Sequence, residues 1–488
     1  MLKADQNLAY VLAAPLLLAG FALMLFFGFL GLFHFLLGLV LFFVGVILAL
    51  RLKSFSQLGD LVVILVSLLI ANWVFFSTLE IFPLLDVSAA VYAVLGSAVL
   101  VLAGRAMRFF PAVKWRFPLA AAAACYLATI LLSIIFAKSP KEVIYFFFIN
   151  ALAIIIGYAV FNFLRLDSSR ARAIGKAIFF FGAISALFAV WQLYSDSFKL
   201  LFFPYLAARD HEILQLWEMV SRVVGTWQHP SYLGIFLAVC VPLGLEQLFF
   251  ERTTRFRRAL LLCCLVLIAA VLLLSNTRSS VLAAGIGSIF LVWKLLASGD
   301  ELLKRKLRNL VWLGAIGACA LLLYQFLFVS EIYSKPQAYR VDASATIWGR
   351  FLRSDAMSTE SLVQRSGLYE LAIKTFASSP VVGVGAKNFQ FRVQDAYGKA
   401  TDAHNIFLQT LAEQGVLGFL ALVFLYFGVV KNLFQAAWKR TASMAFTFSV
   451  TVLLIFFDSI FNNPLYSLRL VGIFWLFIAS ALAHNHIE

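Results

Sequence analysis

Long apolar runs recur along almost the whole of this 488-residue chain, and they constrain its fold more than any other feature. Most of them are about 18 to 22 residues long, which as helix is enough to cross roughly 30 Å of hydrocarbon. Hydrophobic residues make up 63% of the chain and charged residues only 13%, a balance that is foreign to water-soluble domains of this length. The sequence therefore predicts an all-α integral membrane protein.

We predict about 14 transmembrane helices, two long loops and a multi-pass topology. The first run is too long for a signal peptide and is followed at once by another, which indicates an uncleaved span. Loop 195–230 suits short interfacial helices. In loop 330–404 the stretch LYELAIKTFASSP has helical periodicity, so we expect a helical lid packed on the spans. The predicted spans lie near 9–29, 31–50, 61–79, 86–104, 117–136, 143–163, 175–194, 231–250, 259–275, 279–297, 310–329, 405–430, 443–461 and 466–484.

Charge predicts the orientation of these spans. With both termini in the cytoplasm, the inner segments hold 23 Lys/Arg and 8 Asp/Glu, whereas the outer segments hold 16 of each. The whole net charge of +15 then lies on the cytoplasmic side, as the positive-inside rule requires. The basic composition is therefore a signal of topology and of contact with membrane lipids, and it gives no argument for nucleic acid.

Two classes of site are disfavoured by the residue pattern. The five cysteines all fall inside apolar spans, which argues against a disulfide framework or a thiol metal cluster, and no His-Glu-x-x-His or Gly-x-Ser-x-Gly motif is present. We therefore expect no metal and no cofactor. Glu246, Lys294 and Asp458 lie near span ends and we find no broken central helix, which disfavours an ion-coupled transporter or a lipid-carrier flippase.

His404 begins the run HNIFLQTLAEQGVLG, which is the most informative segment for chemistry. We expect Thr401 or Asp402 to cap the following helix, so that His404 falls in its first turn beside Asn405. A helix N-terminus lowers the pKa of an imidazole, and a neutral imidazole can act as a general base on a hydroxyl group. The structural alternative is an interfacial histidine that only hydrogen-bonds a loop.

Gly415 and Gly418 follow in the same run, three residues apart. We expect them to serve close helix packing. Such packing would also fix the direction in which the helix presents His404.

Several cations on the predicted outer face are candidate anion ligands. Arg278 lies in the short break SNTRSS, where it could bind phosphate in forked geometry or serve as a snorkelling anchor. Arg222 begins RVVGTWQHPSYLG, and anion binding and interfacial anchoring are equally open there. Arg365, Tyr369 and Lys387 are weaker candidates, for which a solvated loop surface is the alternative.

Four segments, in this order along the chain, resemble motifs of bacterial O-antigen ligases and their relatives. The segment at 404–418 resembles their His-Asn-x9-Gly-x-x-Gly signature, which is the most specific of the four. The others are weak singly but strong as an ordered set on one membrane face. They are RVVGTWQHPSYLG (222–234), SNTRSS (275–280) and SSPVVGVGAKNF (378–389).

The resemblance implies a polytopic, GT-C-like glycosyltransferase of the bacterial inner membrane. Such an enzyme transfers a glycan from a polyprenyl (undecaprenyl) diphosphate carrier to a saccharide acceptor at the periplasmic face, with inversion and without a metal. It implies that His404 is the base and that Arg222 and Arg278 bind the diphosphate. Trp227 and Ser231 depart from the usual Phe and Asn of the family, as Ser279-Ser280 does from Ser-Gly, which leaves donor and acceptor choice open.

The leading interpretation is an O-antigen ligase acting on lipid A–core in lipopolysaccharide biosynthesis. The nearest alternative is an O-antigen or exopolysaccharide polymerase that joins carrier-linked repeat units, with a chain-length regulator as a partner. Glycan transfer to a periplasmic protein is a third alternative. The predicted domains are a transmembrane bundle at 1–194, a catalytic region at 195–430 and C-terminal transmembrane helices at 431–488.

Overall fold

Helices are the only regular secondary structure in the described ranges, where turns and loops connect them and no β-strand occurs. The predicted all-α class is thus confirmed. The computed structural model describes residues 2–25, 32–73, 87–111, 114–194, 223–227, 229–251, 254–275, 277–297, 356–398, 401–439 and 443–483.

Thirteen of the predicted spans fall on helices of the structure, and the run at 310–329 lies outside the described residues. Within the described ranges, five helices (α7, α8, α12, α13 and α19) are long and apolar enough to cross a membrane, and seven further apolar helices are shorter. The count of about 14 spans stays a prediction.

The helices are α1 (Leu2–Leu25), α3 (Leu32–Leu50), α4 (Phe55–Ala71), α5 (Val87–Met107), α6 (Ala120–Leu132), η2 (Ser133–Phe136), α7 (Pro140–Leu166), α8 (Ser169–Tyr194), α12 (Pro230–Phe250), α13 (Arg255–Leu274), α14 (Arg278–Ala297), α17 (Ala356–Ser378), α18 (Phe389–Tyr397), α19 (Ile406–Lys439), α20 (Ser443–Ser459), η5 (Pro464–Tyr466) and α21 (Leu468–Ala483).

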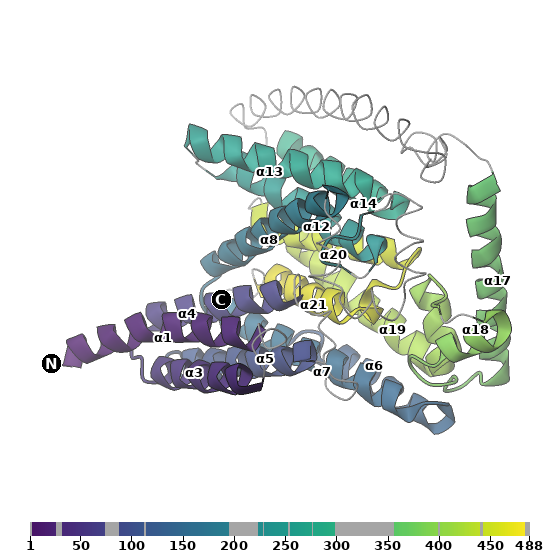
Figure 1. Ribbon diagram of the computed structural model, residues 1–488, viewed down its shortest axis with the longest axis horizontal. Coiled ribbons are helices and arrows are strands. Elements are labelled where there is room, and N and C mark those ends of the chain that lie inside the picture. Colours follow the sequence, from purple (N-terminus) through teal and green to yellow (C-terminus); the bar gives the residue numbers. More distant parts are fainter. Residues whose placement is uncertain are drawn as a thin grey trace.

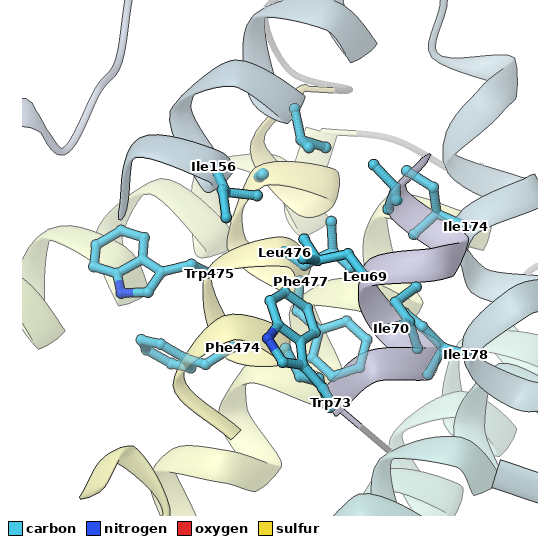
Figure 2. Packing of buried hydrophobic residues seen from close by; sticks show 14 of the residues in the cluster. Leu69, Ile70, Trp73, Ile156, Ile174, Ile178, Phe474, Trp475, Leu476 and Phe477 are labelled. Atoms are coloured by element: carbon cyan, nitrogen blue, oxygen red, sulfur yellow. The ribbon is translucent and has the colours of Figure 1, made fainter. Parts of the chain in front are cut away.

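The last helix, α21, is a central element of the bundle. Its sequence is apolar around nearly the whole circumference, which is typical of a helix enclosed by others, and every side chain from Arg469 to Ala483 is buried. Gly472 leaves room for the Trp73 indole, which a Cβ would overlap. Figure 2 shows the resulting core, in which Phe474, Trp475, Leu476 and Phe477 of α21 lie among Leu69 and Ile70 of α4, Trp73 just after α4, Ile156 of α7, and Ile174 and Ile178 of α8.

Basic connections that the topology assigns to the cytoplasm contact one another at one end of the bundle. Arg170, in the first turn of α8, pairs with Asp60 of α4 at 2.6 Å. Lys176 of α8 pairs with Glu251, at the end of α12, at 2.7 Å. Connections far apart in the sequence are thus grouped as the alternating topology predicts.

The opposite end of the bundle carries a small second core. Figure 1 shows α17 lying across this end, far from the N-terminus, next to α18 and the start of α19. The helical periodicity predicted at 368–380 is confirmed in the main by α17. Its function as a lid stays a prediction. The second core consists of Leu368, Ala372, Phe389, Val393, Ala403 and Ala412.

Helix α19 is broken at Gly415, which has φ 65° and ψ −164°. Such a break leaves backbone N–H and C=O groups without helical partners, and these are costly next to hydrocarbon. The segment 380–385 supplies the missing partners. The N–H groups of Val384 and Gly385 donate to the carbonyls of Ala412 and Glu413 at 3.1 and 2.8 Å. On the other side of the break, Val416 N–H donates to Pro380 O at 2.8 Å.

The break corrects two expectations from the sequence. A Cβ on Gly415 would overlap the backbone of Val381 and Val382, so its close partner is a loop and not a second helix. Gly418 faces the side chain of Gln414, one turn earlier in the same element. The expected absence of a broken central helix is also wrong, and that argument against a transporter no longer stands.

We predict that Gly415→Ala destabilises the protein by at least about 1–2 kcal/mol, because a left-handed backbone costs an L-residue that much even without the overlap. Thermal unfolding of the detergent-purified protein measures the effect. Gly285→Ala on α14 is the matched control, since a Cβ there meets nothing within 4 Å. Equal melting temperatures for the two variants would contradict the assigned backbone conformation.

Candidate functional site

His404 lies just ahead of α19 in a left-handed backbone conformation, with φ 54°. The helix begins at Ile406, and the side chain of Asn405 caps it, because Asn405 Oδ1 accepts from the N–H groups of Phe407 and Leu408, both at 3.0 Å. The expected cap by Thr401 or Asp402 is therefore wrong. So is the position of His404 in the first helical turn, since it precedes the cap.

The connection between α20 and α21, residues 460–467, joins the two segments that the sequence singled out. Asn405 Nδ2 donates to the carbonyl of Ile460 at 3.0 Å. Asn462 Nδ2 donates to Ser279 Oγ, next to Arg278, at 3.0 Å. The turn that carries His404 and the turn that carries Arg278 are thus fixed to one short piece of chain, although 126 residue positions separate them in the sequence.

The Arg278 turn is also fixed by its own residue Thr277 and by α12. Arg278 begins α14 with an exposed side chain, whereas Thr277 is buried and shares a hydrogen bond of 2.7 Å with Ser275. Gly234 of α12 lies directly against Thr277, where a Cβ would overlap the threonine hydroxyl. The turn therefore has a defined position from which the guanidinium extends.

Glu413 is a fully buried carboxylate two residues before the break in α19. Its Oε1 accepts from the Gln409 side chain at 2.7 Å and from Phe389 N–H at 3.2 Å. Its Oε2 accepts from the Tyr466 hydroxyl at 2.7 Å and from Lys387 N–H at 2.8 Å. One side chain thus ties the first half of α19 to loop 380–389 and to the end of the α20–α21 connection.

Sequence reasoning missed Glu413, although its signal was present. An acidic residue inside an apolar span, two positions before a glycine, is costly unless it is bonded on all sides. Asp458 and Glu246, expected near span ends, are also fully buried.

Of the weaker candidates, Lys387 joins this network most directly. It has a left-handed backbone with φ 62°, and its ammonium lies 4.9 Å from the centre of the Tyr466 ring. Arg365 lies on α17 near enough for its charge to act on His404. Tyr369 lies one turn further along α17 and is partly buried.

Arg222 lies outside the described residues, but the segment that follows it is firmly held. The N–H groups of Val224 and Gly225 both donate to Gln192 Oε1 at 2.9 Å. Arg469, at the start of α21, donates to Thr226 O at 2.6 Å. The backbone immediately after Arg222 is therefore anchored to α8 and α21.

His229 and Tyr232 extend the site beyond the predicted residues. His229 caps α12, its Nδ1 accepting from Ser231 N–H at 3.2 Å, and its ring lies 5.5 Å from that of Tyr232. Tyr232 is close enough to Asp402 and Asp458 for their charges to act on its hydroxyl. The start of α12 thus lies beside the residues that surround His404.

The surroundings of His404 hold its pKa below the ordinary value for histidine. Burial is the largest cause, the Arg365 charge adds to it, and the Asp402 carboxylate opposes both. The predicted lowering of the His404 pKa is confirmed, but its leading cause is burial and not the helix N-terminus. The imidazole is therefore neutral near pH 7 and able to accept a proton.

The described residues contain no group of three or more His, Cys, Asp or Glu side chains arranged to hold a metal ion. What the site offers is a neutral imidazole with the Arg365 guanidinium near enough to act on it, and bonded carboxylates in the segments around it. Such a set can take a proton from a hydroxyl and can bind an anion.

Residues 263–423, about a third of the chain, match the family model described as O-antigen ligase. The resemblance to the O-antigen ligase and polymerase superfamily is confirmed over this range, which includes Arg278, Arg365, Lys387, His404 and Glu413. The segment at 222–234 and the connection at 460–467 lie outside it. No curated protein matches the chain significantly. The match supports a membrane glycosyltransferase activity of the ligase or polymerase type, with a lipid-linked glycan and an acceptor as substrates.

We predict that two neutralising substitutions shift the acidic limb of the pH–rate profile in opposite directions. Arg365→Gln removes a cation, so the pKa of His404 rises and activity is lost at a higher pH. Asp402→Asn removes an anion, so the pKa falls and activity persists to a lower pH. The profile of kcat/KM against pH measures both, and Arg392→Gln on the exposed side of α18 is the control. Shifts of the same sign would rule out His404 as the titrating base.

Proposed function

We propose, from the match of residues 263–423 to the O-antigen ligase family, that this chain is an inverting, metal-independent glycosyltransferase of the bacterial inner membrane. It moves a glycan from an undecaprenyl diphosphate carrier onto a lipid A–core acceptor at the periplasmic face. The catalytic region is 195–430, between the N-terminal bundle at 1–194 and the C-terminal helices at 431–488, and both termini are cytoplasmic.

One observation carries the proposal: the turns of His404 and Arg278 are attached to the same connection between α20 and α21. A transferase of this kind needs a base near the attacking hydroxyl and cations near the leaving diphosphate. Arg278 is exposed at the start of α14, and α17 lies across the same end of the bundle.

The reaction requires one bond to form and one to break at the anomeric carbon. The acceptor oxygen attacks from the face opposite the carrier, and the bond between the anomeric carbon and the phosphate oxygen breaks. His404 takes the hydroxyl proton, and the polyprenyl diphosphate leaves with the electron pair. Arg278 and Arg222 offset the charge of the diphosphate, which is already a good leaving group. The apolar spans hold the lipid tail, and loop 330–404 covers the sugars.

The alternative is a polymerase of O-antigen or exopolysaccharide, assisted by a chain-length regulator. It shares the donor, the base and the cations with the ligase. The family match carries both activities equally, so the acceptor alone separates them. Transfer to a hydroxyl group of a periplasmic protein would need the same base, whereas carrier flipping needs no base.

We predict that His404→Ala lowers transfer about 10²- to 10⁴-fold, the usual contribution of a general base, with little change in donor binding. Arg278→Gln instead weakens donor binding. Transfer from purified carrier-linked glycan in detergent, with no energy source, measures the rate, and binding of the carrier diphosphate is measured separately. Lys374→Gln, at an exposed pair with Glu370, is the control.

Full product formation by His404→Ala would remove the mechanism. Loss of activity on adding a chelator would show that the reaction depends on a metal, contrary to the proposal.

We predict that the products distinguish ligase from polymerase. Incubation of donor with purified core acceptor should give a single shift in the mobility of the core for a ligase. Donor alone should give no larger product, because a ligase does not join carrier-linked units. A ladder of repeats from donor alone would establish the polymerase instead.

A further inference from the structure

His404 has a backbone conformation that few residues other than glycine adopt. Its φ of 54° lies in the left-handed region, where a larger side chain is strained unless its surroundings fix it. On one side of it, Asn405 caps α19 and donates to Ile460 O at 3.0 Å. On the other side, the N–H of Ala403 donates to the side-chain oxygen of Gln409 at 2.7 Å. The imidazole is therefore carried by a backbone that is held before and after it.

Glu413 determines which way the Gln409 amide points. Gln409 is fully buried in α19, and its Nε2 donates to Glu413 Oε1 at 2.7 Å. That oxygen also accepts from Phe389 N–H, so it presents an acceptor, and the amide must turn its NH2 group toward it. The Gln409 oxygen is then left for the N–H of Ala403. The opposite orientation would oppose two oxygens at one end of the amide and two N–H groups at the other.

The Glu413 carboxylate is itself fixed from outside α19. One of its oxygens accepts from Lys387 N–H at 2.8 Å and the other from Phe389 N–H at 3.2 Å. Backbone N–H groups cannot reverse, so an amide in place of this carboxylate would set its NH2 group against one of them whichever way it turned. A carboxylate accepts from both. Hydrogen bonds thus form a continuous path from loop 380–389, through this carboxylate and the amide one turn before it, to the residue that precedes His404.

We propose that Gln409 is a positioning residue for the base: it transmits the fixed position of Glu413 to the backbone before His404 and so keeps the imidazole aimed at the acceptor hydroxyl. The inference rests on the proposed function, because it takes His404 as the base. A fully buried side chain does not reach either substrate, so the effect of Gln409 falls on the chemical step and not on binding. Losing its bond to Ala403 releases one side of a strained turn, and a misplacement of about 1 Å lowers the rate of chemistry about 100-fold.

The test is a double-mutant cycle on the full-length protein in detergent. Gln409→Met has a side chain of similar length that forms neither hydrogen bond, and Gln409→Asn is the milder variant, whose amide is one methylene too short to reach both partners. Gln414→Met is the matched control, because Gln414 is a buried glutamine of the same helix whose side-chain oxygen accepts instead from Thr129 Oγ1 of α6 at 3.3 Å. Each variant is made with His404 present and with His404→Ala. The measured quantities are kcat and the KM for donor and for acceptor.

The expected result is that both Gln409 variants lower kcat about 10- to 100-fold and leave both KM values unchanged. Gln414→Met keeps the wild-type kcat, even where its melting temperature is lower. In the His404→Ala background Gln409→Met causes no further loss, because the glutamine acts through the imidazole. A further loss of the same size in that background, or an unchanged kcat in both Gln409 variants, overturns the inference.

An NMR signal of the imidazole separates failure of the inference from failure of the proposed function. In protein labelled with carbon-13 in its histidine rings, the His404 signal is assigned by its loss in His404→Ala. Gln409→Met should shift or broaden this signal, and Gln414→Met should leave it unchanged. A shifted signal in a protein that transfers no glycan, or that stays fully active as His404→Ala, rejects the transferase mechanism and keeps the positioning contact. A rate that depends on His404, with signal and kcat unchanged in Gln409→Met, rejects the positioning role alone.

Discussion

The buried carboxylate of Glu413 is the interaction on which the site depends. It lies next to a break in α19, where hydrocarbon surrounds the bundle and unpaired backbone groups are costly. Its four hydrogen bonds satisfy the charge and at the same time fix three separate segments. Each of these donors would cost about 1–3 kcal/mol if it were left buried without a partner. The carboxylate and its donors therefore hold one another in place.

The break and the carboxylate act together on His404. Loop 380–385 fills the gap left by Gly415, and Glu413 holds the next part of the same loop through Lys387 and Phe389. Gln409, one turn before Glu413, accepts from the N–H of Ala403 at 2.7 Å. The residue directly before His404 is thus bonded to the same network. The position of the imidazole therefore follows from contacts with the loop before it, with the first turns of α19 and, through Asn405, with Ile460.

Much of the outline was predictable, because it depends on patterns of local chemistry. Apolar length predicted the helices, and the excess of Lys and Arg predicted which connections meet at one end, as the Arg170–Asp60 and Lys176–Glu251 pairs illustrate. The motif that begins at His404 pointed to the segment matched by the family model. The capping residue was wrong, because Asn405 and Asp402 are both good caps and only the turn at Ile460, bonded to Asn405, decides between them. Glu413 and the break at Gly415 were missed, because their partners come from a loop about thirty residues away.

The sequence by itself determined that the chain is an all-helical membrane protein, which of its connections are basic, and that a histidine precedes a hydrophobic helix. These properties follow from residue composition within one turn or one span. Only the tertiary structure decided that the connection between α20 and α21 joins the His404 turn to the Arg278 turn, that α19 is broken, and that Lys387 is held in a strained conformation. Those features depend on hydrogen bonds between residues tens to hundreds of positions apart. Local preference does not specify such bonds, and they form only when the packed helices bring their partners together.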